Sequence, residues 1–402
     1  MRARCSLALL LLLAIPAGAA WGNPLTHEEL STQAIAHSPV IKAMDLAIEA
    51  AKARAEVSGA RNNPSLVGQV QVSPTSDHNM ITLGFRQLLD FRGLASQRRA
   101  QAEEEVEILG LQRTRLKQEV AAQAQEAYWQ AWLARTELQR KTRDLDWQRD
   151  ELNRVRKRLD VGTASRHELI DVELDLLEAE LAQRNAQQQA QGQLARLNFL
   201  LGRAVDAPLE LAEPKPELGT LAPLSAWVDE AQLNRPEPRQ VAIARRREIR
   251  GIRLAESLSF GEGELEAQAG TAANSDPLLY GSFDLPLPLW NRHEGERRAA
   301  SADAARLDVE LLASRQAISQ EVLTAYYAAV ETRSRLVDVN ERLIPHAEHL
   351  VEKAEDRLKL GAANRTELQS ARHAYSQAES ERAKAQLDYQ LSLLRLQTAV
   401  GR

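Results

Sequence analysis

The chain of 402 residues carries a formal net charge of −5, and aromatic residues make up only 4% of it. Its acidic and basic residues are interspersed, which gives no support to a nucleic-acid partner. Alanine, leucine, glutamate, glutamine and arginine dominate, a composition that is typical of long helices or coiled coils and argues against a compact enzyme with a thick mixed core.

The first 22 residues are predicted to be a secretory signal peptide. Arg2 and Arg4 give a basic start, residues 7–15 are an apolar stretch too short to span a bilayer, and residues 17–20 are small residues suited to cleavage. The single cysteine, Cys5, lies inside this peptide, so we expect neither a disulfide nor a lipid anchor in the mature protein. No later stretch of 18 apolar residues predicts a transmembrane helix, which leaves a periplasmic, a secreted or a β-stranded outer-membrane protein.

The first half of the mature chain predicts one helix, two short strands and a long helical hairpin. Apolar residues at every second position indicate the strands. Gly162 and the Asn62-Asn63-Pro64 sequence indicate where helices end. The expected elements are a helix at 25–61, strands at 66–72 and 79–86, and helices at 94–159 and 166–201. The helix at 94–159 would be roughly 100 Å long and needs partner helices along its whole length.

The second half of the chain repeats the first. Residues 158–203 align without a gap with residues 357–402, and identical pairs include Arg158/Arg357, Gly162/Gly361 and Glu168/Glu367. Alternating apolar residues predict further strands at 264–269 and 279–287, the latter including Leu285 and Leu287, and Pro345 should kink the long helix of this half. We divide the chain at the proline-rich linker into a signal peptide (1–22), a first repeat (23–212) and a second repeat (213–402).

The four predicted strands can lie in a membrane only if several copies of the chain assemble. Their apolar faces could cover a soluble core or contact lipid, and a sheet in a membrane must close because hydrocarbon cannot satisfy open edges. Four strands cannot close alone, and eight give a barrel about filled by its own side chains. Twelve strands from three chains would leave a water-filled lumen, lined by residues such as Glu264, Glu266 and Gln268.

The order of helix, strand pair and long helical hairpin, found twice, resembles the TolC-type outer-membrane efflux proteins over essentially the whole mature chain. The most specific marks are the two predicted hairpin tips, Arg158-Leu-Asp-Val-Gly162 with Glu168-Leu169 and Arg357-Leu-Lys-Leu-Gly361 with Glu367-Leu368. The segment Asp284-Leu-Pro-Leu-Pro-Leu-Trp-Asn-Arg-His-Glu-Gly295 is similar to the branch that serves cobalt–zinc–cadmium-type metal efflux pumps.

This resemblance implies a mainly α-helical homotrimer with a twelve-stranded barrel in the outer membrane and a long periplasmic helical tunnel. It also implies docking on a periplasmic adaptor protein and an inner-membrane pump of the RND type, with heavy-metal cations or other small molecules as cargo. The implied adaptor contacts are Val161, Gly162 and Thr163 at one tip and Leu360, Gly361 and Ala362 at the other. Glu367 matches an acidic position that narrows the periplasmic aperture, whereas Ser370 stands where the family often has a second acid.

Other candidate sites are of simpler kinds. Phe91 and Trp290 each follow a second strand and are expected at the membrane interface, in contact with outer-membrane lipid. His346 and His349 have no third ligand at a suitable spacing, so we predict no metal site. No nucleophile elbow, P-loop, dinucleotide fingerprint or zincin motif occurs, so we expect neither enzyme activity nor a cofactor.

The sequence is also compatible with two alternative functions. A periplasmic adaptor or coiled-coil scaffold also uses long helical hairpins, although such a scaffold has no reason for strand pairs at equivalent places in both halves. An outer-membrane duct for a type I protein secretion system would share the architecture and differ only in its cargo.

Overall fold

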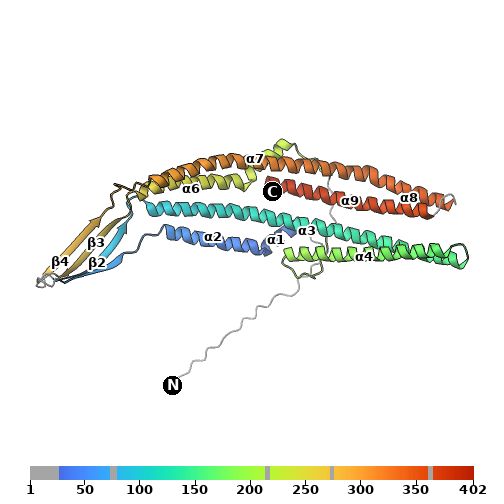
Figure 1. Cartoon of the computed structure of the whole chain (residues 1–402), viewed down its shortest axis with the longest axis horizontal. Helices are drawn as coiled ribbons and strands as arrows, with labels where there is room; N and C mark the ends of the chain where they lie inside the picture. Colours follow the sequence, from blue (N-terminus) through green and yellow to red (C-terminus); the bar gives the residue numbers. More distant parts are fainter. Residues whose placement is uncertain (1–26, 73–78, 213–217, 272–275, 361–364) are drawn as a thin grey trace, which may run out of the picture.

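The structure, a computed structural model, describes residues 27–72, 79–212, 218–271, 276–360 and 365–402. This part of the chain forms an elongated molecule, with a small β-sheet at one end and the tips of two helical hairpins at the other (Figure 1). The predicted signal peptide lies outside the described residues, and so do Gly361 and Ala362 of the second predicted tip.

The two halves of the chain share one order of elements. The first half contains α1 (His27–His37), α2 (Pro39–Ser58), β1 (Ser65–Gln71), β2 (Met80–Leu89), α3 (Leu94–Asp160) and α4 (Arg166–Leu200). The second half contains α5 (Leu224–Asn234), α6 (Pro236–Leu258), β3 (Gly263–Thr271), β4 (Pro277–Asp284), α7 (Glu294–Asp338), a π-helical turn η2 (Val339–Leu343), α8 (Ile344–Lys359) and α9 (Arg365–Val400). The predicted mainly helical class with a small β part is confirmed.

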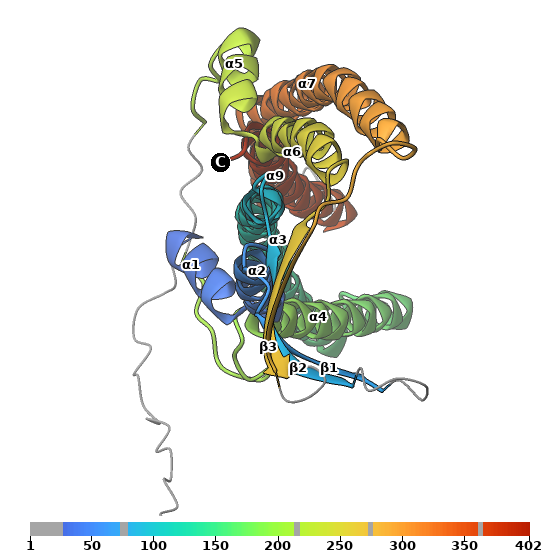
Figure 2. The ribbon, with the colours of Figure 1, turned by 90° about the vertical axis from the view of Figure 1, so that its left-hand side faces the viewer.

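The prediction of a single helix at 25–61 is wrong, because two helices, α1 and α2, occupy this region. Ser38 is extended, with φ −64° and ψ 119°, and Pro39 begins α2. Proline disfavours the helical conformation of the residue before it, while its own fixed φ suits the first turn of a helix. Arg235 and Pro236 make the same break between α5 and α6 in the second half. Figure 2 shows α1 and α5 on one flank of the long helices.

Helix α3 confirms the predicted long helix almost residue for residue. It spans 67 residues, which corresponds to about 100 Å of helix. It starts where it does because Asp90 caps it: the backbone N–H of Leu94 and that of Ala95 donate to the Asp90 carboxylate at 2.8 and 2.9 Å. Gly93 precedes the helix in the left-handed region, with φ 70°.

The distortion predicted at Pro345 takes the form of the π-helical turn Val339–Leu343. Pro345 has no N–H for the carbonyl one turn back, so a regular α-helical ladder cannot continue through it. The wider turn absorbs this defect and lets α8 continue from α7. The equivalent stretch of α3 is regular throughout.

The four strands form one antiparallel sheet in the order β1-β2-β3-β4. The register pairs Val70 with Ile81 and Leu265 with Phe283, so most of the apolar residues of the four strands share one face. This face is open to solvent in the single chain: Phe85 is 65% exposed and Leu279 is 83% exposed. A large exposed apolar face of this kind marks contact with lipid or protein.

The opposite face of the sheet is polar and closely packed. Arg86 of β2 pairs with Glu264 and Glu266 of β3 at 2.7 and 2.8 Å. Gln268 is only 2% exposed and lies within hydrogen-bond contact of Thr82 and Glu266. The residues predicted to line a lumen therefore lie together on the face opposite to the apolar one.

Two glycines on this polar face permit the close approach of β2 and β3. Gly84 faces Gln268 and Gly270 faces Thr82 in the register of these strands. A Cβ added at Gly84 would collide with the backbone carbonyl of Ala267, and one added at Gly270 would collide with that of Ile81. Only glycine fits these positions without a change in the strand pairing.

The predicted strand at 279–287 is too long. Strand β4 ends at Asp284, and Leu285 and Leu287 lie in the segment that leads to α7. Pro286 and Pro288 interrupt the alternation, and proline cannot donate a backbone hydrogen bond to a neighbouring strand. The apolar alternation therefore outlasts the strand itself.

Each half has its own small core where the short helices pack on the long ones. Leu30 of α1, Tyr128 of α3 and Leu197 of α4 are buried together in the first half. A second cluster of the same kind joins α5, α7 and α9, with Trp227, Val322, Leu396 and Val400 as its main members. Trp129 of α3 is buried in the first cluster beside Tyr128.

Candidate functional site

The first hairpin tip is a tight turn between α3 and α4. Gly162 adopts φ +75°, and nothing lies within 4 Å of the position that a Cβ would take there. The backbone N–H of Thr163 donates to the carbonyl of Arg158 at 2.8 Å, which closes the end of α3 in the manner of a Schellman cap. Val161 is 73% exposed, so the turn presents an apolar side chain and open backbone at the end of the molecule.

An ion pair locks each tip. Arg158 Nη1 lies 2.5 Å from Glu168 Oε1 across the first hairpin, and Arg357 Nη1 lies 2.5 Å from Glu367 Oε1 across the second. These residues are the identical pairs of the sequence repeat, so both hairpins use the same clasp. Arg158 also donates to the carbonyl of Thr163 at 3.0 Å.

At the second tip the structure describes the helix ends on both sides of residues 361–364. Leu360 directly follows α8 and is 82% exposed, matching Val161 of the first tip. Gly361 and Ala362, which were predicted to contact an adaptor, lie outside the described residues. The roles predicted for Val161, Gly162, Thr163 and Leu360 stay predictions.

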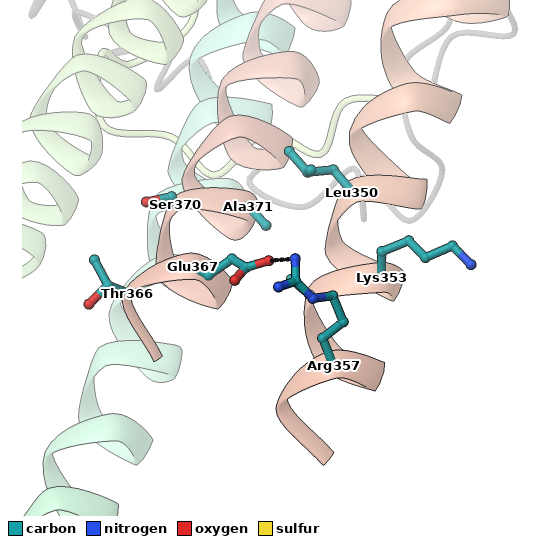
Figure 3. A pocket seen from close by; sticks show the side chains of 8 residues that line it. Leu350, Lys353, Arg357, Thr366, Glu367, Ser370 and Ala371 are labelled. Carbon is teal, nitrogen blue, oxygen red and sulfur yellow. Dashed lines mark hydrogen bonds and ion pairs between the residues drawn. The ribbon is translucent and has the colours of Figure 1, made fainter. Parts of the chain in front are cut away.

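A cleft of about 520 Å³ lies between α8 and α9 just behind the second tip. Figure 3 shows Glu367 directed toward Arg357 across this cleft, with Ser370 one turn further along the same helix. Lys353 also lines the cleft, so two basic side chains accompany the single acid. The two predicted aperture residues thus share one cleft, but the charge of Glu367 is balanced locally.

The two hairpins of the chain are tied together close to their tips. Arg365, the first residue of α9, forms an ion pair with Glu151 of α3. One turn further on, Gln369 Nε2 donates to Asp175 Oδ2 of α4 at 2.7 Å. Helix α9 therefore lies against both helices of the first hairpin in this region.

A buried polar network joins α3 and α9 further from the tips. The side chain of Arg140 is only 10% exposed and pairs with Glu137 at 2.6 Å and with Asp144 at 3.2 Å. Arg140 also donates to Ser376 Oγ at 2.5 Å, and Ser380 donates to Glu137 at 2.6 Å. Burial raises the pKa of Glu137, but the hydrogen bonds from Ser380 and Arg140 outweigh it, so this pKa lies below its ordinary value.

At the opposite end of the molecule, the two predicted interface aromatics occupy equivalent junctions. Phe91 follows β2 and is 56% exposed, and Trp290 follows β4 and is 93% exposed. The ring of Phe91 meets that of Phe283 edge-on, with centroids 6.1 Å apart, so it extends the apolar face of the sheet. None of the helices among the described residues is long and apolar enough to cross a membrane.

The histidines of the second hairpin do not converge on a metal site. His346 Nδ1 lies 2.6 Å from the carbonyl of Arg342, and His349 lies 3.5 Å from Glu352 on the same helix. Within the described residues, no three His, Cys, Asp or Glu side chains are grouped so that they could hold a metal ion.

Sequence reasoning identified the tips but missed the contacts that hold them. The identity of Arg158/Arg357 and of Glu168/Glu367 was visible, and the equal separation within each pair could have indicated the two clasps. The Arg365–Glu151 and Arg140–Ser376 contacts join residues more than 200 positions apart, and no periodic signal marks them.

The sequence profile of the family described as outer membrane efflux protein matches residues 30–203 and 227–402. The fold is similar to that of CusC, with 16% identity, a TM-score of 0.77, and 96% of this chain and 95% of that chain covered. It is also similar to the open state of the Neisseria gonorrhoeae MtrE outer membrane channel, with 18% identity, a TM-score of 0.75 and coverages of 93% and 88%. The outer membrane protein VceC from Vibrio cholerae matches with 16% identity, a TM-score of 0.74 and coverages of 93% and 96%. The comparison with curated proteins gives no match.

Proposed function

This chain belongs to the outer membrane efflux protein family, and from that premise we propose that three copies form one exit duct that docks a periplasmic adaptor at its hairpin tips. The protein is an efflux channel component of the outer membrane. The trimer, the adaptor and the residues that contact it are the proposed part. Family membership favours a duct over a soluble periplasmic scaffold.

The observation that carries the trimer is the two-faced, open-edged sheet. Its apolar face is exposed and its polar face is internally paired, which suits lipid on one side and water on the other. Strands β1 and β4 lie at the two edges of the sheet, and a membrane does not tolerate unpaired edges. Three chains of four strands are the smallest closed assembly that leaves a lumen.

The helices supply independent support for assembly. Helix α4 carries an exposed apolar stripe at the spacing of a coiled-coil seam, formed by Ile170, Leu174, Leu177 and Leu181, each more than half exposed. On α7, Val309 and Leu312 are 66% and 62% exposed. We infer that neighbouring chains cover these stripes, because a coiled-coil seam is stable only when a partner helix covers it.

The tips are the surfaces that we assign to the adaptor and, through it, to an inner-membrane pump of the RND type. Val161 and Leu360 are exposed apolar residues at the ends of the two hairpins, and the turn that follows Val161 leaves backbone groups accessible. We propose contacts at Val161, Gly162, Thr163, Leu360, Gly361 and Ala362. No catalytic step and no cofactor belong to this proposal, because passage through a duct needs neither.

The cargo that we propose is small molecules, with heavy-metal cations as one class. The sequence likeness of residues 284–295 to metal efflux components favours cations. The cleft at Glu367 does not add to that case, since Lys353 and Arg357 lie in it as well. Glu367 and Ser370 are proposed to line the periplasmic aperture, with Glu367 held by its clasp to Arg357.

Cross-linking tests the docking proposal directly, because the only cysteine of the chain is Cys5 in the predicted signal peptide. A Val161→Cys variant should cross-link to the adaptor in whole cells, whereas Arg184→Cys, exposed in the middle of α4, should not. The mass of the detergent-solubilised complex should equal three chains. A monomer, or equal cross-linking from both positions, would contradict the proposal.

A further inference from the structure

We propose that the junction between sheet and helices binds the phosphate groups of membrane phospholipids through Arg92 and Arg292. This junction surface consists of Phe91, Arg92, Leu287, Leu289, Trp290 and Arg292. The inference rests on the proposed insertion of the sheet into the membrane and adds a specific ligand class to it.

Three segments that are distant in sequence meet here. The guanidinium of Arg92, just after β2, lies 3.9 Å from the ring centroid of Phe260, at the end of α6. Beside it, Ser259 Oγ donates to the carbonyl of Arg292 at 2.9 Å. Residues 259 and 260 therefore lie between the two arginines and bring them to one place.

The two guanidinium groups have unused donors. Both residues are exposed, and neither forms an ion pair with a carboxylate of the described chain. Arg292 Nε donates to the carbonyl of Pro288 at 3.3 Å, which leaves its other N–H groups for a ligand. By contrast, Arg98 and Arg297 nearby have carboxylate partners, Glu262 at 3.5 Å and Glu256 at 3.6 Å.

The apolar part of the junction surface defines what kind of ligand fits. Leu287 is 67% exposed, Leu289 is 60% exposed and Trp290 is 93% exposed, and all three lie shortly before Arg292 in the chain. Phe91, which directly precedes Arg92 in the chain, contacts Phe283 on the apolar face of the sheet. The surface is thus continuous with the face that contacts lipid chains, and its charged groups lie at the edge of that face.

Arginines beside exposed tryptophan and leucine match the chemistry of a phospholipid at the membrane surface. The apolar side chains enter the acyl region, and the guanidinium groups remain at the level of the phosphates, which they can bind in two-point geometry. A basic residue at an anionic membrane surface strengthens binding by about fivefold.

The test is a lipid titration of the full assembly. The purified complex in a neutral detergent is titrated with phosphatidylglycerol, and native mass spectrometry counts the lipid-bound fraction. The double variant Arg92→Gln with Arg292→Gln should raise the apparent dissociation constant by about 25-fold. The control variant Arg315→Gln with Arg382→Gln makes the same charge change at exposed positions away from the junction, and it should bind like the unaltered protein.

Unchanged binding by the junction variant, or equal weakening by the control, would overturn the inference. So would competition by inorganic phosphate at the same molar concentration, because free phosphate does not use the leucines and Trp290. If loss of the Arg92–Phe260 contact prevents assembly, Arg292→Gln alone tests the proposal. Its apparent dissociation constant for phosphatidylglycerol should rise by about fivefold. Trimer mass and outer-membrane location of the same variants are read separately, so failure here is distinguishable from failure of the duct proposal.

Discussion

Arg365 at the start of α9 forms an ion pair with Glu151 of α3, so the second hairpin is tied to the first near the tips of both. The Glu151 side chain is only 14% exposed, and Gln369 adds a second link to Asp175 of α4. These two polar contacts therefore help to fix the separation of the two tips.

Arg365→Gln should loosen the tips without unfolding the chain. A partly exposed pair contributes about 1 kcal/mol or less, so we expect amide hydrogen exchange near Leu360 and Arg166 to accelerate by about fivefold. Hydrogen exchange with mass spectrometry measures this effect. Arg149→Gln is the control, because Arg149 pairs with Asp146 inside α3 and joins no second hairpin. Equal acceleration in both variants would mean that the Arg365–Glu151 pair does not hold the hairpins together.

The Arg140 network should make stability depend on pH in the acid range. The pKa of Glu137 is lowered in the folded protein, so its contribution is present above its ordinary value of 4.5 and is lost as pH falls through the folded value. Glu137→Gln should cost about 1–2 kcal/mol at pH 7, and this difference should shrink below pH 4.5. Thermal unfolding at a series of pH values gives the comparison. Glu119→Gln, which removes a more exposed pair with Arg115, should cost less at every pH.

Gly84 should not tolerate any side chain. Gly84→Ala places a methyl group on the backbone of β3, and we expect a loss of about 2–4 kcal/mol or failure of the sheet to form. The matched change Gly281→Ala on β4 meets only the carbonyl of Glu266 at 3.9 Å and should be nearly neutral. Heat-resistant assembly on gels, together with thermal unfolding, separates the two outcomes. A stable Gly84→Ala protein would show that β2 and β3 can move apart.

Trp290 should lie in the lipid layer. In vesicles that contain lipids brominated near the headgroup, much of the quenchable tryptophan fluorescence should disappear when Trp290 is replaced by phenylalanine. Trp147, which lies under the guanidinium of Arg372 at 5.2 Å in the helical region, provides the control. Trp147→Phe should leave the quenched fraction unchanged. Loss of quenching only in the Trp147 variant would contradict the prediction, because it would place the membrane at the helical region and not at the sheet.

Local features of the sequence predicted most of the fold. The periodicity of apolar residues predicts helix α3 and the strand pairs. The turn at Gly162 is predicted because this glycine lies between two helical patterns. The break at Pro39 was missed because both sides of it are helical, so the pattern continues through the interruption. Strand β4 was overextended because Leu285 and Leu287 keep the alternation after Pro286 has ended the ladder.

The contacts of the candidate site were less accessible to prediction. The clasp between Arg158 and Glu168 is local and repeated, and the duplicated sequence contains enough information to find it. The pair of Arg365 with Glu151 depends on how the second hairpin packs against the first, which neither segment encodes alone. The same holds for Arg92 and Arg292, which share one junction because Phe260 and Ser259, just after α6, contact one arginine each.

The π-helical turn gives the two halves of the chain different mechanical properties. Helix α3 is an unbroken rod of 67 residues that runs from the sheet to the first tip, whereas the path to the second tip passes through the turn Val339–Leu343. A force applied by a partner at both tips would be carried to the sheet mainly by α3, while the second half would bend at the π-helical turn. In the proposed ring of three chains, stiff first hairpins and bendable second hairpins would alternate around the circumference. The periplasmic end would then change shape while the shape of the membrane end stays the same.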